Sequence, residues 1–506
     1  MSVGKRFCAV LKDAPNLYIA VAIGILASFI RIVFSVDLYR DAANVYCFMA
    51  RALAENNFAD AFHSGIPSLN VLLSRPLTLA GIAPEQAMTI ISCLFYVLSI
   101  FFLYNLLKEF VAEKLACMGA LFYACAPKLI QFSCTPLIDS GKIFFLIAAL
   151  YFARRLIREN FSSYRLALWF GGMLGGLALA RSEGIGIAGV LAGALGVCYL
   201  LNAYQQKKFP PYLPLLSGVF TFVLLIASRI FLMYLHSGMF VFDSRISKGV
   251  CRVAARFAGA GATVTEGVAK PLRVSWGHLV NQNFRGSYEV YFIFACIGLL
   301  LIVSAALWKE REKLFPDKKV PEFVKWDSFY LVFLAVILCN ALFFKLSDIA
   351  AYRYFLLNIP LLMIFTIIGF GALWIWCEKF VPGKLLYIVT GCLLACQIFN
   401  GLSNAFDKSS RYQYETGHYI GRLLNAKENT GKVWFLDKAS IEWYYSGMRR
   451  AVPVEDPKPP LETFNDFEYV LCPVKGNEID VIVKRGDLRE IPLPAYSKVR
   501  LFQKIR

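Results

Sequence analysis

The sequence has little charge and few metal-binding side chains. Charged residues make up only 17% of its 506 positions, and a soluble chain of this length would carry more. The 14 cysteines contain no Cys-x-x-Cys pair, which argues against a disulfide framework or a zinc site. The four histidines follow no ligand spacing: His63, His236, His278 and His418. No glycine-rich phosphate loop follows a strand, so a nucleotide-binding domain is not expected.

What the sequence has in abundance is long apolar runs, and 58% of its residues are hydrophobic. Such runs need lipid as their solvent, and about 20 apolar residues suffice to cross a bilayer as a helix. We therefore predict an all-α polytopic membrane protein with about eleven spans. The candidate spans are 17–36, 88–107, 115–133, 137–153, 166–180, 185–201, 213–235, 290–308, 328–344, 354–376 and 384–400. No small-residue cleavage site follows 17–36, so this run is expected to remain as a first span.

The net charge of +18 is concentrated in alternate short loops between the spans. One set of loops holds roughly 19 basic residues in about 70 positions, and the other roughly 14 in about 130, which predicts that the denser set is cytoplasmic. This pattern orients helices, so nucleic acid is not an expected partner, whereas membrane lipids are. We predict a cytoplasmic N-terminus, an outer C-terminus, and outer loops at 37–87 and 236–289. The short loops suit a bacterial plasma (inner) membrane.

Both long outer loops contain amphipathic segments. In 41–57, Val45, Phe48, Met49, Ala52 and Leu53 share one helical face, and 248–261 repeats this spacing with basic residues opposite. Such patterns predict helices that lie in the membrane interface. Within the span 166–180, four glycines follow small-xxx-small spacing, which predicts close helix packing. These are Gly171, Gly172, Gly175 and Gly176.

From residue 405 the chain becomes more charged, and short β-rich runs appear. The runs are Val433–Leu436, Tyr469–Leu471, Val481–Val483 and Val499–Phe502, after a helix expected at Tyr414–Lys427. We predict a membrane domain at 1–404 and a small extracytoplasmic α/β domain at 405–506.

Two carboxylates close to the predicted outer membrane face are candidates for chemistry. Asp41 follows the first span, and Asp139 begins the fourth. Carboxylates at the edge of hydrocarbon are costly and often functional. A carboxylate can accept the proton of a hydroxyl that attacks an anomeric carbon. The alternative is that either residue only caps a helix, and the two roles are compatible.

Several cations could bind a phosphate group on the same side. Arginine binds phosphate through two parallel hydrogen bonds, which suits an isoprenoid-phosphate head group. The alternative for the loop residues is contact with water or lipid head groups. The candidates are Arg245, Lys248, Arg252, Arg256, Lys270 and Arg273 in the second outer loop, with Lys345 and Arg353 beyond it.

Four motifs resemble those of the GT-C glycosyltransferases, in the branch of protein O-mannosyltransferases and the lipid A aminoarabinose transferase. Arg40-Asp41 through Glu55-Asn56 resembles the first outer loop of that family. Arg181-Ser182-Glu183-Gly184 is similar to an Arg-Pro-Glu-Gly turn, and Tyr352-Arg353-Tyr354 to an Arg-Tyr motif before a late span. Trp443 to Gly447 is similar to the Tyr-Tyr-Ser-Gly of its outer domain.

The resemblance implies an inverting transferase that moves a sugar from a polyprenyl-phosphate donor to a glycan, lipid or protein acceptor. Asp41 and Asp139 match the acidic positions, and Arg353 would contact the donor phosphate. Ala42 stands where a second acidic residue is common, so metal assistance is doubtful and no cofactor is expected. The candidate substrate-binding residues are Arg40, Tyr46, His63, Arg75, Arg245, Lys248, Lys345, Tyr352 and Arg353.

Two other classes remain open at this point. A multi-span transporter or lipid flippase would need no catalytic base, but the two similar halves typical of transporters are not visible. A non-catalytic subunit is compatible with the carboxylate missing at Ala42. We expect Arg181 and Glu183 to form a structural ion pair near the outer face.

Overall fold

The structure, a computed structural model, describes most of the chain apart from some loops. The described residues are 15–35, 38–39, 41–63, 69–181, 183–238, 240, 275, 277, 280–281, 289–307, 327–347, 352–403, 408–426, 428–429, 431–436, 439–450, 467–474, 482 and 486–505.

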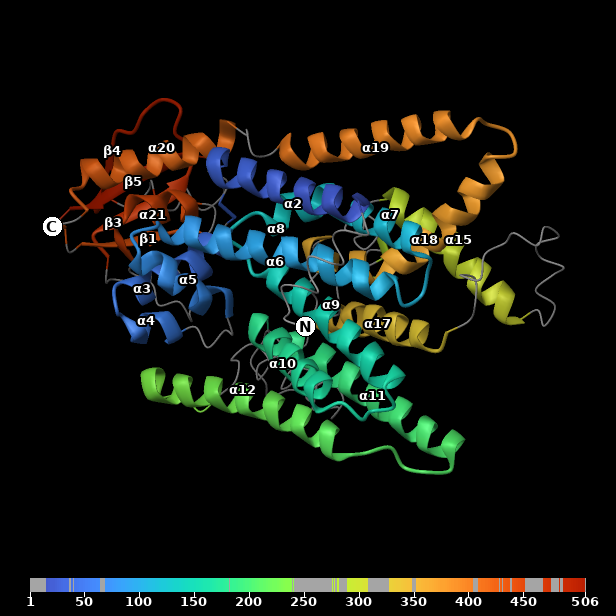
Figure 1. Ribbon diagram of the computed structural model, residues 1–506. Coiled ribbons are helices and arrows are strands. Elements are labelled where there is room, and N and C mark those ends of the chain that lie inside the picture. Colours follow the sequence, from blue (N-terminus) through green and yellow to red (C-terminus); the bar gives the residue numbers. More distant parts are fainter. Residues whose placement is uncertain are drawn as a thin grey trace.

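Long apolar helices make up the larger part of the molecule, and every predicted span falls on one of them (Figure 1). They are α2 (Pro15–Phe34), α6 (Pro84–Leu107), α7 (Glu113–Ala124) with α8 (Pro127–Ser133), α9 (Asp139–Arg158), α10 (Tyr164–Ala180), α11 (Gly184–Gln206), α12 (Leu213–Ser237), α15 (Glu289–Leu307), α17 (Phe329–Ser347), α18 (Asn358–Cys377) and α19 (Gly383–Ser403). The helical fold class is therefore confirmed.

The number of membrane spans stays a prediction. Six of the described helices are long and apolar enough to cross a bilayer, or seven if α7 and α8, bent by 56°, count as one span. Helix α9 is not among them, because Asp139 and Lys142 lie in its first turns and three arginines near its end. Helices α10, α15 and α17 have shorter apolar segments.

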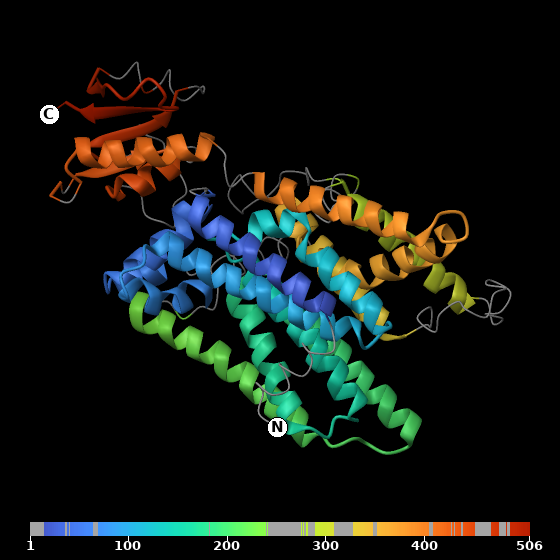
Figure 2. The same ribbon diagram turned by 45° about the horizontal axis from the view of Figure 1, so that its top comes forward.

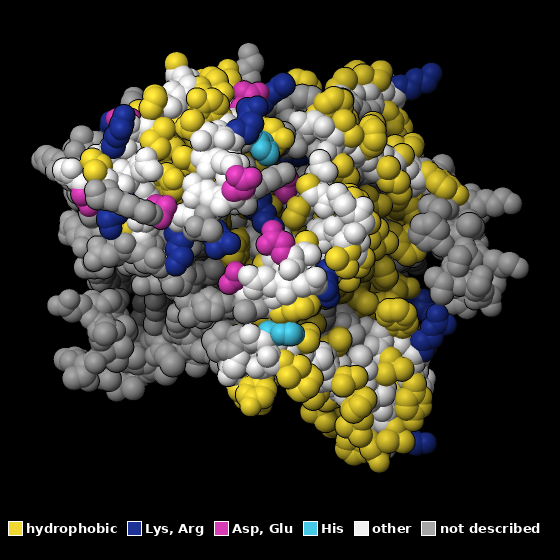
Figure 3. Space-filling view, turned by 90° about the vertical axis from the view of Figure 1, so that its left-hand side faces the viewer, with side chains coloured by type: hydrophobic (Ala, Val, Ile, Leu, Met, Phe, Trp, Pro, Cys, Tyr) yellow, Lys and Arg dark blue, Asp and Glu magenta, His cyan; other side chains and the backbone are white. Residues whose placement is uncertain are grey.

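Large apolar side chains lie exposed on the outer helices. Examples are Phe29 on α2 and Phe220 on α12, which are 60% and 67% exposed. Figure 3 shows acidic and basic side chains around the middle of one end of the molecule, and hydrophobic side chains toward its right and lower parts. Exposed apolar surface on this scale requires lipid. The chain is an integral, multi-pass membrane protein.

Gly171 and Gly176 of α10 pack closely, as their spacing predicts, whereas a Cβ atom on Gly172 would have room. A Cβ atom on Gly171 would lie 2.0 Å from the carbonyl oxygen of Gly218 on α12, so the two backbones touch. At Gly176, a Cβ would meet the ring of Phe145 on α9. The helices approach this closely because neither position carries a side chain.

The first outer loop folds into η1 (Ala42–Tyr46), α3 (Cys47–Ala54), α4 (Phe58–His63) and α5 (Leu69–Leu79). The helix expected in 41–57 is present and is covered by protein, and its place in the lipid interface stays a prediction. Ala50, opposite the expected apolar face, is as buried as Met49 and Leu53. Protein surrounds α3, because α5, α6 and the C-terminal part pack against it. The second expected interfacial helix, 248–261, lies outside the described residues.

The C-terminal part is an α/β unit that projects from one end of the helices (Figure 2). Its elements are α20 (Lys408–Leu423), β1 (Lys432–Phe435), α21 (Ser440–Ser446), β2 (Arg449–Arg450), β3 (Tyr469–Pro473), β4 (Leu488–Ile491) and β5 (Val499–Lys504). The sheet order is β2-β1-β3-β5-β4, with β1 parallel to both neighbours and β5 antiparallel to both of its own.

Three of the four predicted strands coincide with β1, β3 and β5. The fourth, 481–483, falls outside the described residues except for Ile482. The domain boundary predicted at 404/405 also lies outside them, and it stays a prediction.

The C-terminal unit docks on the first outer loop and on the start of α6. The hydroxyl of Tyr444 donates a 2.8 Å hydrogen bond to Oε2 of Glu85. Arg51 donates to the carbonyl oxygen of Tyr444 at 3.2 Å, and its guanidinium lies 4.1 Å from the centre of the Tyr444 ring. The loop 37–87 and the tail therefore lie on the same side of the helices, as the loop charges predict.

Candidate functional site

Asp41 and Arg353 meet at the end of the helices that carries α3 to α5. Asp41 directly precedes η1, and its side chain makes no capping hydrogen bond to that helix. Its carboxylate forms an ion pair with the guanidinium of Arg353, which lies in the short helix η2 (Tyr352–Phe355), 312 positions along the chain. The interpretation of Asp41 as a mere helix cap is therefore wrong.

Asp139 belongs to a second, buried group of charges. It begins α9 and pairs with Arg181, which follows α10. The Nε of Arg181 lies 2.8 Å from Oε1 of Glu183, and Nζ of Lys142 lies 2.9 Å from the same oxygen. Two cations and two anions thus balance in one cluster, which we call the buried charge quartet (Asp139, Lys142, Arg181 and Glu183). The expected Arg181–Glu183 ion pair is present.

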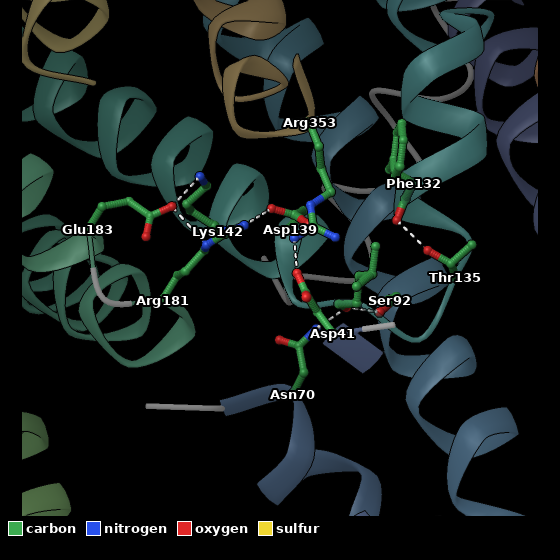
Figure 4. A network of polar contacts seen from close by, with 11 residues as sticks. Asp41, Asn70, Ser92, Phe132, Thr135, Asp139, Lys142, Arg181, Glu183 and Arg353 are labelled. Carbon is green, nitrogen blue, oxygen red and sulfur yellow. Dashed lines mark hydrogen bonds and ion pairs between the residues drawn. The ribbon is translucent and has the colours of Figure 1, made fainter. Parts of the chain in front are cut away.

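The two groups differ in how far solvent reaches them. The side chain of Asp41 is 39% exposed, whereas that of Asp139 is 2% exposed. Figure 4 shows the Arg353–Asp41 pair on one side of Asp139 and the other quartet members on its opposite side. Asp41 can therefore meet a substrate, whereas Asp139 faces its ion-pair partners.

Backbone contacts fix the segment that leads into Asp139. The carbonyl oxygen of Leu137 accepts hydrogen bonds from Ser92 at 2.6 Å and from the amide of Asn70 at 3.3 Å. A Cβ atom on Gly141 would lie 2.5 Å from Oδ1 of Asn70. The absence of a side chain there lets α5 and α9 approach, so this segment is held from two helices.

The quartet must remain complete to be tolerated in the membrane part. Removing a charge from water into a low-dielectric interior costs several kcal/mol, and only good pairing offsets that cost. Each member of the quartet has an opposite charge within the cluster. The loss of any one member would leave a buried charge without its partner.

The structure also describes three other predicted substrate-binding residues, and two of them make contacts within the protein. Tyr46 is 5% exposed and belongs to the hydrophobic core. Arg75, on α5, donates to Oδ1 of Asn56 at 3.0 Å and covers the ring of Phe58, so it braces the first outer loop. Lys345 lies in the last turn of α17, the helix before Arg353.

The remaining predicted substrate-binding positions fall where the structure does not describe the side chain. Arg40, Arg245 and Lys248 lie outside the described residues, as do the side chains of His63 and Tyr352. Within the ranges that the structure describes, no three His, Cys, Asp or Glu side chains gather as they would to hold a metal ion.

Lys142 is the residue that the sequence reasoning missed. It follows Asp139 by three positions, so both side chains lie on one face of α9. A single lysine in an otherwise apolar run was a usable signal, because an isolated charge there demands a partner. Its partner Glu183 could not be paired with it from spacing alone, since 41 positions separate them.

The arrangement suits acid–base chemistry next to a phosphate. An accessible carboxylate can accept a proton, and a guanidinium beside it can stabilise negative charge that develops on a leaving phosphate.

Residues 67–234 match the family model described as dolichyl-phosphate-mannose-protein mannosyltransferase. A search of curated protein sequences finds no match.

Solved structures give the clearest likeness. ArnT from Cupriavidus metallidurans bound to undecaprenyl phosphate superposes with a TM-score of 0.64 at 11% identity, over 96% of this chain and 97% of ArnT. The oligosaccharyltransferase of Archaeoglobus fulgidus, in complex with zinc and sulfate, gives 0.51 at 13% identity, over 90% of this chain and 68% of that one.

At such identities the structural likeness establishes the fold, and the family-model match lies within the membrane part of that fold. The chain therefore has the GT-C fold, which it shares with these two solved structures.

Proposed function

We propose that the chain transfers a sugar from a polyprenyl-phosphate donor to an acceptor hydroxyl, with inversion at the anomeric carbon. The reaction would take place at the extracytoplasmic face, on the side that carries α3 to α5 and the C-terminal sheet. The membrane would be a bacterial plasma membrane, with the N-terminus in the cytoplasm. The sugar is a hexose or a pentose.

The observation that carries this proposal is the ion pair between Asp41 and Arg353. It joins an accessible carboxylate to a cation in the short helix η2, which precedes α18. A transporter needs no such pair of base and phosphate ligand at its rim. The bound undecaprenyl phosphate in the ArnT structure makes a polyprenyl-phosphate donor the natural choice.

The proposed reaction begins when the donor phosphate approaches Arg353. The phosphate competes with Asp41 for the guanidinium, because arginine binds phosphate bidentately. Asp41 is then available to the acceptor hydroxyl. Its carboxylate accepts the hydroxyl proton while the hydroxyl oxygen forms a bond to the anomeric carbon.

The bond between that carbon and the phosphate oxygen breaks on the opposite face of the sugar. The polyprenyl phosphate leaves with the bonding electron pair, and Arg353 stabilises the charge that builds on it.

Asp139 serves this reaction as a positioning residue. Its side chain is shielded and paired with Arg181, so it does not reach the acceptor in this conformation. The quartet fixes the start of α9 beside the Asp41–Arg353 pair, which keeps the reacting groups at a defined separation.

The test is transfer by the purified, full-length protein in lipid nanodiscs. Synthetic undecaprenyl-phosphate-linked hexoses and pentoses are incubated with a cell-envelope fraction as acceptor, and release of undecaprenyl phosphate is measured. Asp41→Asn removes the proton acceptor and keeps the shape, so we expect transfer to fall at least 100-fold, within the range for loss of a general base.

The matched control is Asp60→Asn in α4 of the same outer loop. Asp60 is exposed, and its hydrogen bonds within the described residues are local: its carboxylate accepts from Asn57 at 2.7 Å. This variant should transfer like the unaltered protein. Full transfer by a folded Asp41→Asn protein would overturn the proposal.

A further inference from the structure

An open cavity of about 510 Å³ lies on the C-terminal unit, and neither Asp41 nor Arg353 lines it. Four of its lining residues come from α20 and one from the segment before β5. They are Tyr414, Glu415, His418, Arg422 and Tyr496. None of them takes part in the reaction described above.

Aromatic rings form the walls of this cavity. Tyr496 stacks on Tyr412 with ring centres 5.7 Å apart and 28° between planes, and both rings are about 40% exposed. Tyr414 meets His418 edge-on at 4.4 Å. Exposed aromatic faces of this kind offer flat apolar surface at little cost in conformational entropy.

Polar groups accompany the rings. Burial lowers the pKa of His418, so its imidazole is neutral near pH 7 and offers one donor and one acceptor. Glu415 accepts from Arg411 at 3.3 Å. Arg422 has no acidic partner among the described residues. The cavity thus combines flat aromatic rings with hydrogen-bond donors and acceptors, both neutral and charged. This combination suits a molecule with apolar faces and with hydroxyl groups at its edges.

The cavity connects to the membrane part through Tyr445 on α21. Tyr445 packs edge-on against Tyr414 at 4.8 Å. A Cβ atom on Gly417 would lie 2.5 Å from Cβ of Tyr445, so the bare glycine lets α21 lie directly on α20. Tyr445 thus contacts Tyr414, one of the residues that line the cavity.

Tyr445 also lines a small cavity of about 30 Å³ between the C-terminal unit and the helices. Leu38 and Pro136 also line this space, and each precedes one of the acidic residues, Asp41 or Asp139, by three positions. Tyr445 therefore contacts the lining of the larger cavity and also shares a small space with the segments that lead to Asp41 and Asp139.

We infer that the cavity of Tyr414, His418, Arg422 and Tyr496 is a saccharide-binding subsite that holds the acceptor as a glycan. Its rings would stack on the apolar faces of a sugar, and its polar groups would bind ring hydroxyls or an acidic substituent. This inference rests on the proposed function and narrows its acceptor class from glycan, lipid or protein to glycan.

The test separates binding from transfer. The full chain in fluorescent nanodiscs, without donor lipid, is applied to an array of neutral and acidic oligosaccharides that also holds serine- and threonine-containing peptides. We expect concentration-dependent binding to oligosaccharides. The double variant Arg422→Ala/Tyr496→Ala should weaken it at least tenfold. The matched control Arg449→Ala, which removes an exposed arginine of β2 outside the cavity, should leave it unchanged.

Binding to peptides alone, no binding to any oligosaccharide, or equal binding by the double variant would each overturn the inference. Failure of the proposed function has a different signature, because oligosaccharide binding would then depend on Arg422 and Tyr496 while the unaltered protein transfers no sugar. In the transfer assay, the double variant should raise the acceptor KM with little change in kcat.

Discussion

At the scale of single residues, two groups of charges do different work. Asp41 and Arg353 are partly open, and their pairing can be exchanged for pairing with a substrate. The buried charge quartet is closed, and its members satisfy one another. The difference follows from burial, since a shielded ion pair is costly to break whereas an exposed one is weak.

The quartet gives the first prediction at this scale. Lys142→Met leaves Glu183 and Asp139 with one cation between them. We expect a loss of about 3–5 kcal/mol of stability, the usual cost of a buried charge without its partner. The apparent melting temperature of the purified protein measures it.

A double variant serves as the decisive comparison. Lys142→Met/Glu183→Gln removes one charge of each sign, so it should recover a large part of the loss. Lys108→Met is the control, because Lys108 is more exposed and its ion pair with Glu113 contributes at most about 1 kcal/mol. Equal losses in the single and double variants would speak against charge compensation.

Glu442 in α21 gives a prediction on pH dependence. Burial raises the pKa of its carboxyl from 4.5 to about 7, and its Oε2 has no hydrogen-bond partner. The folded protein thus holds this proton more tightly than the unfolded chain. The stabilisation is complete below pH 4.5 and is lost as the pH rises through 7, by about 3 kcal/mol.

Glu442→Gln should therefore melt higher than the unaltered protein at pH 8 and close to it at pH 4. Glu490 provides the contrast, since its hydrogen bond with Arg500 lowers its pKa. Glu490→Gln should lose stability above pH 4.5 instead. Melting curves between pH 4 and 8 compare the two, and a parallel shift in both would contradict the assignment.

At the scale of elements, the structure is organised by how closely the helices pack. The contact of α10 with α12 depends on bare backbone at Gly171 and Gly218. Gly171→Ala would place a Cβ atom 2.0 Å from a carbonyl oxygen, and neither backbone can move without shifting its helix. Overpacking of this kind costs about 1–3 kcal/mol.

The neighbouring glycine is a natural control. A Cβ on Gly172 would meet only Thr221, at 4.0 Å, so Gly172→Ala should be close to neutral. The yield of monodisperse protein and its melting temperature report both variants. Equal tolerance at the two positions would rule out the close contact.

At the scale of the whole molecule, Arg51 and Glu85 make polar contacts with Tyr444 of the C-terminal unit. Arg51→Ala removes both the hydrogen bond to the Tyr444 carbonyl and the cation–π contact with its ring. We expect the docking to weaken by about 1–3 kcal/mol. Trypsin should then release a fragment that contains the sheet more rapidly, while the helices stay intact in the membrane.

Arg449→Ala is the control. Like Arg51→Ala it removes one trypsin site, but this site lies in the C-terminal unit itself, and the release rate should be unchanged. If the docking also aligns the acceptor, Arg51→Ala will lower transfer without abolishing it. Unaltered proteolysis of the Arg51→Ala protein would show that other contacts hold the unit.

The sequence by itself determined the helices, most of the strands and the side of the molecule on which the first loop and the tail meet. Hydrophobic run length and loop charge are local properties, so they can be read without knowing what packs where. Local sequence patterns also predicted the close packing at Gly171 and Gly176 and the strands β1, β3 and β5. Asp41 and Arg353 could likewise be chosen as candidates from the sequence.

Only the tertiary structure decided which charges meet. Spacing could not pair Asp41 with Arg353 or Lys142 with Glu183, because no helical or strand period links residues so far apart. Nor could it show that α3 is buried: an amphipathic pattern reports that one face is apolar, not whether lipid or protein covers it. In the structure, protein covers α3, and Arg51 of this helix contacts Tyr444 of the C-terminal unit.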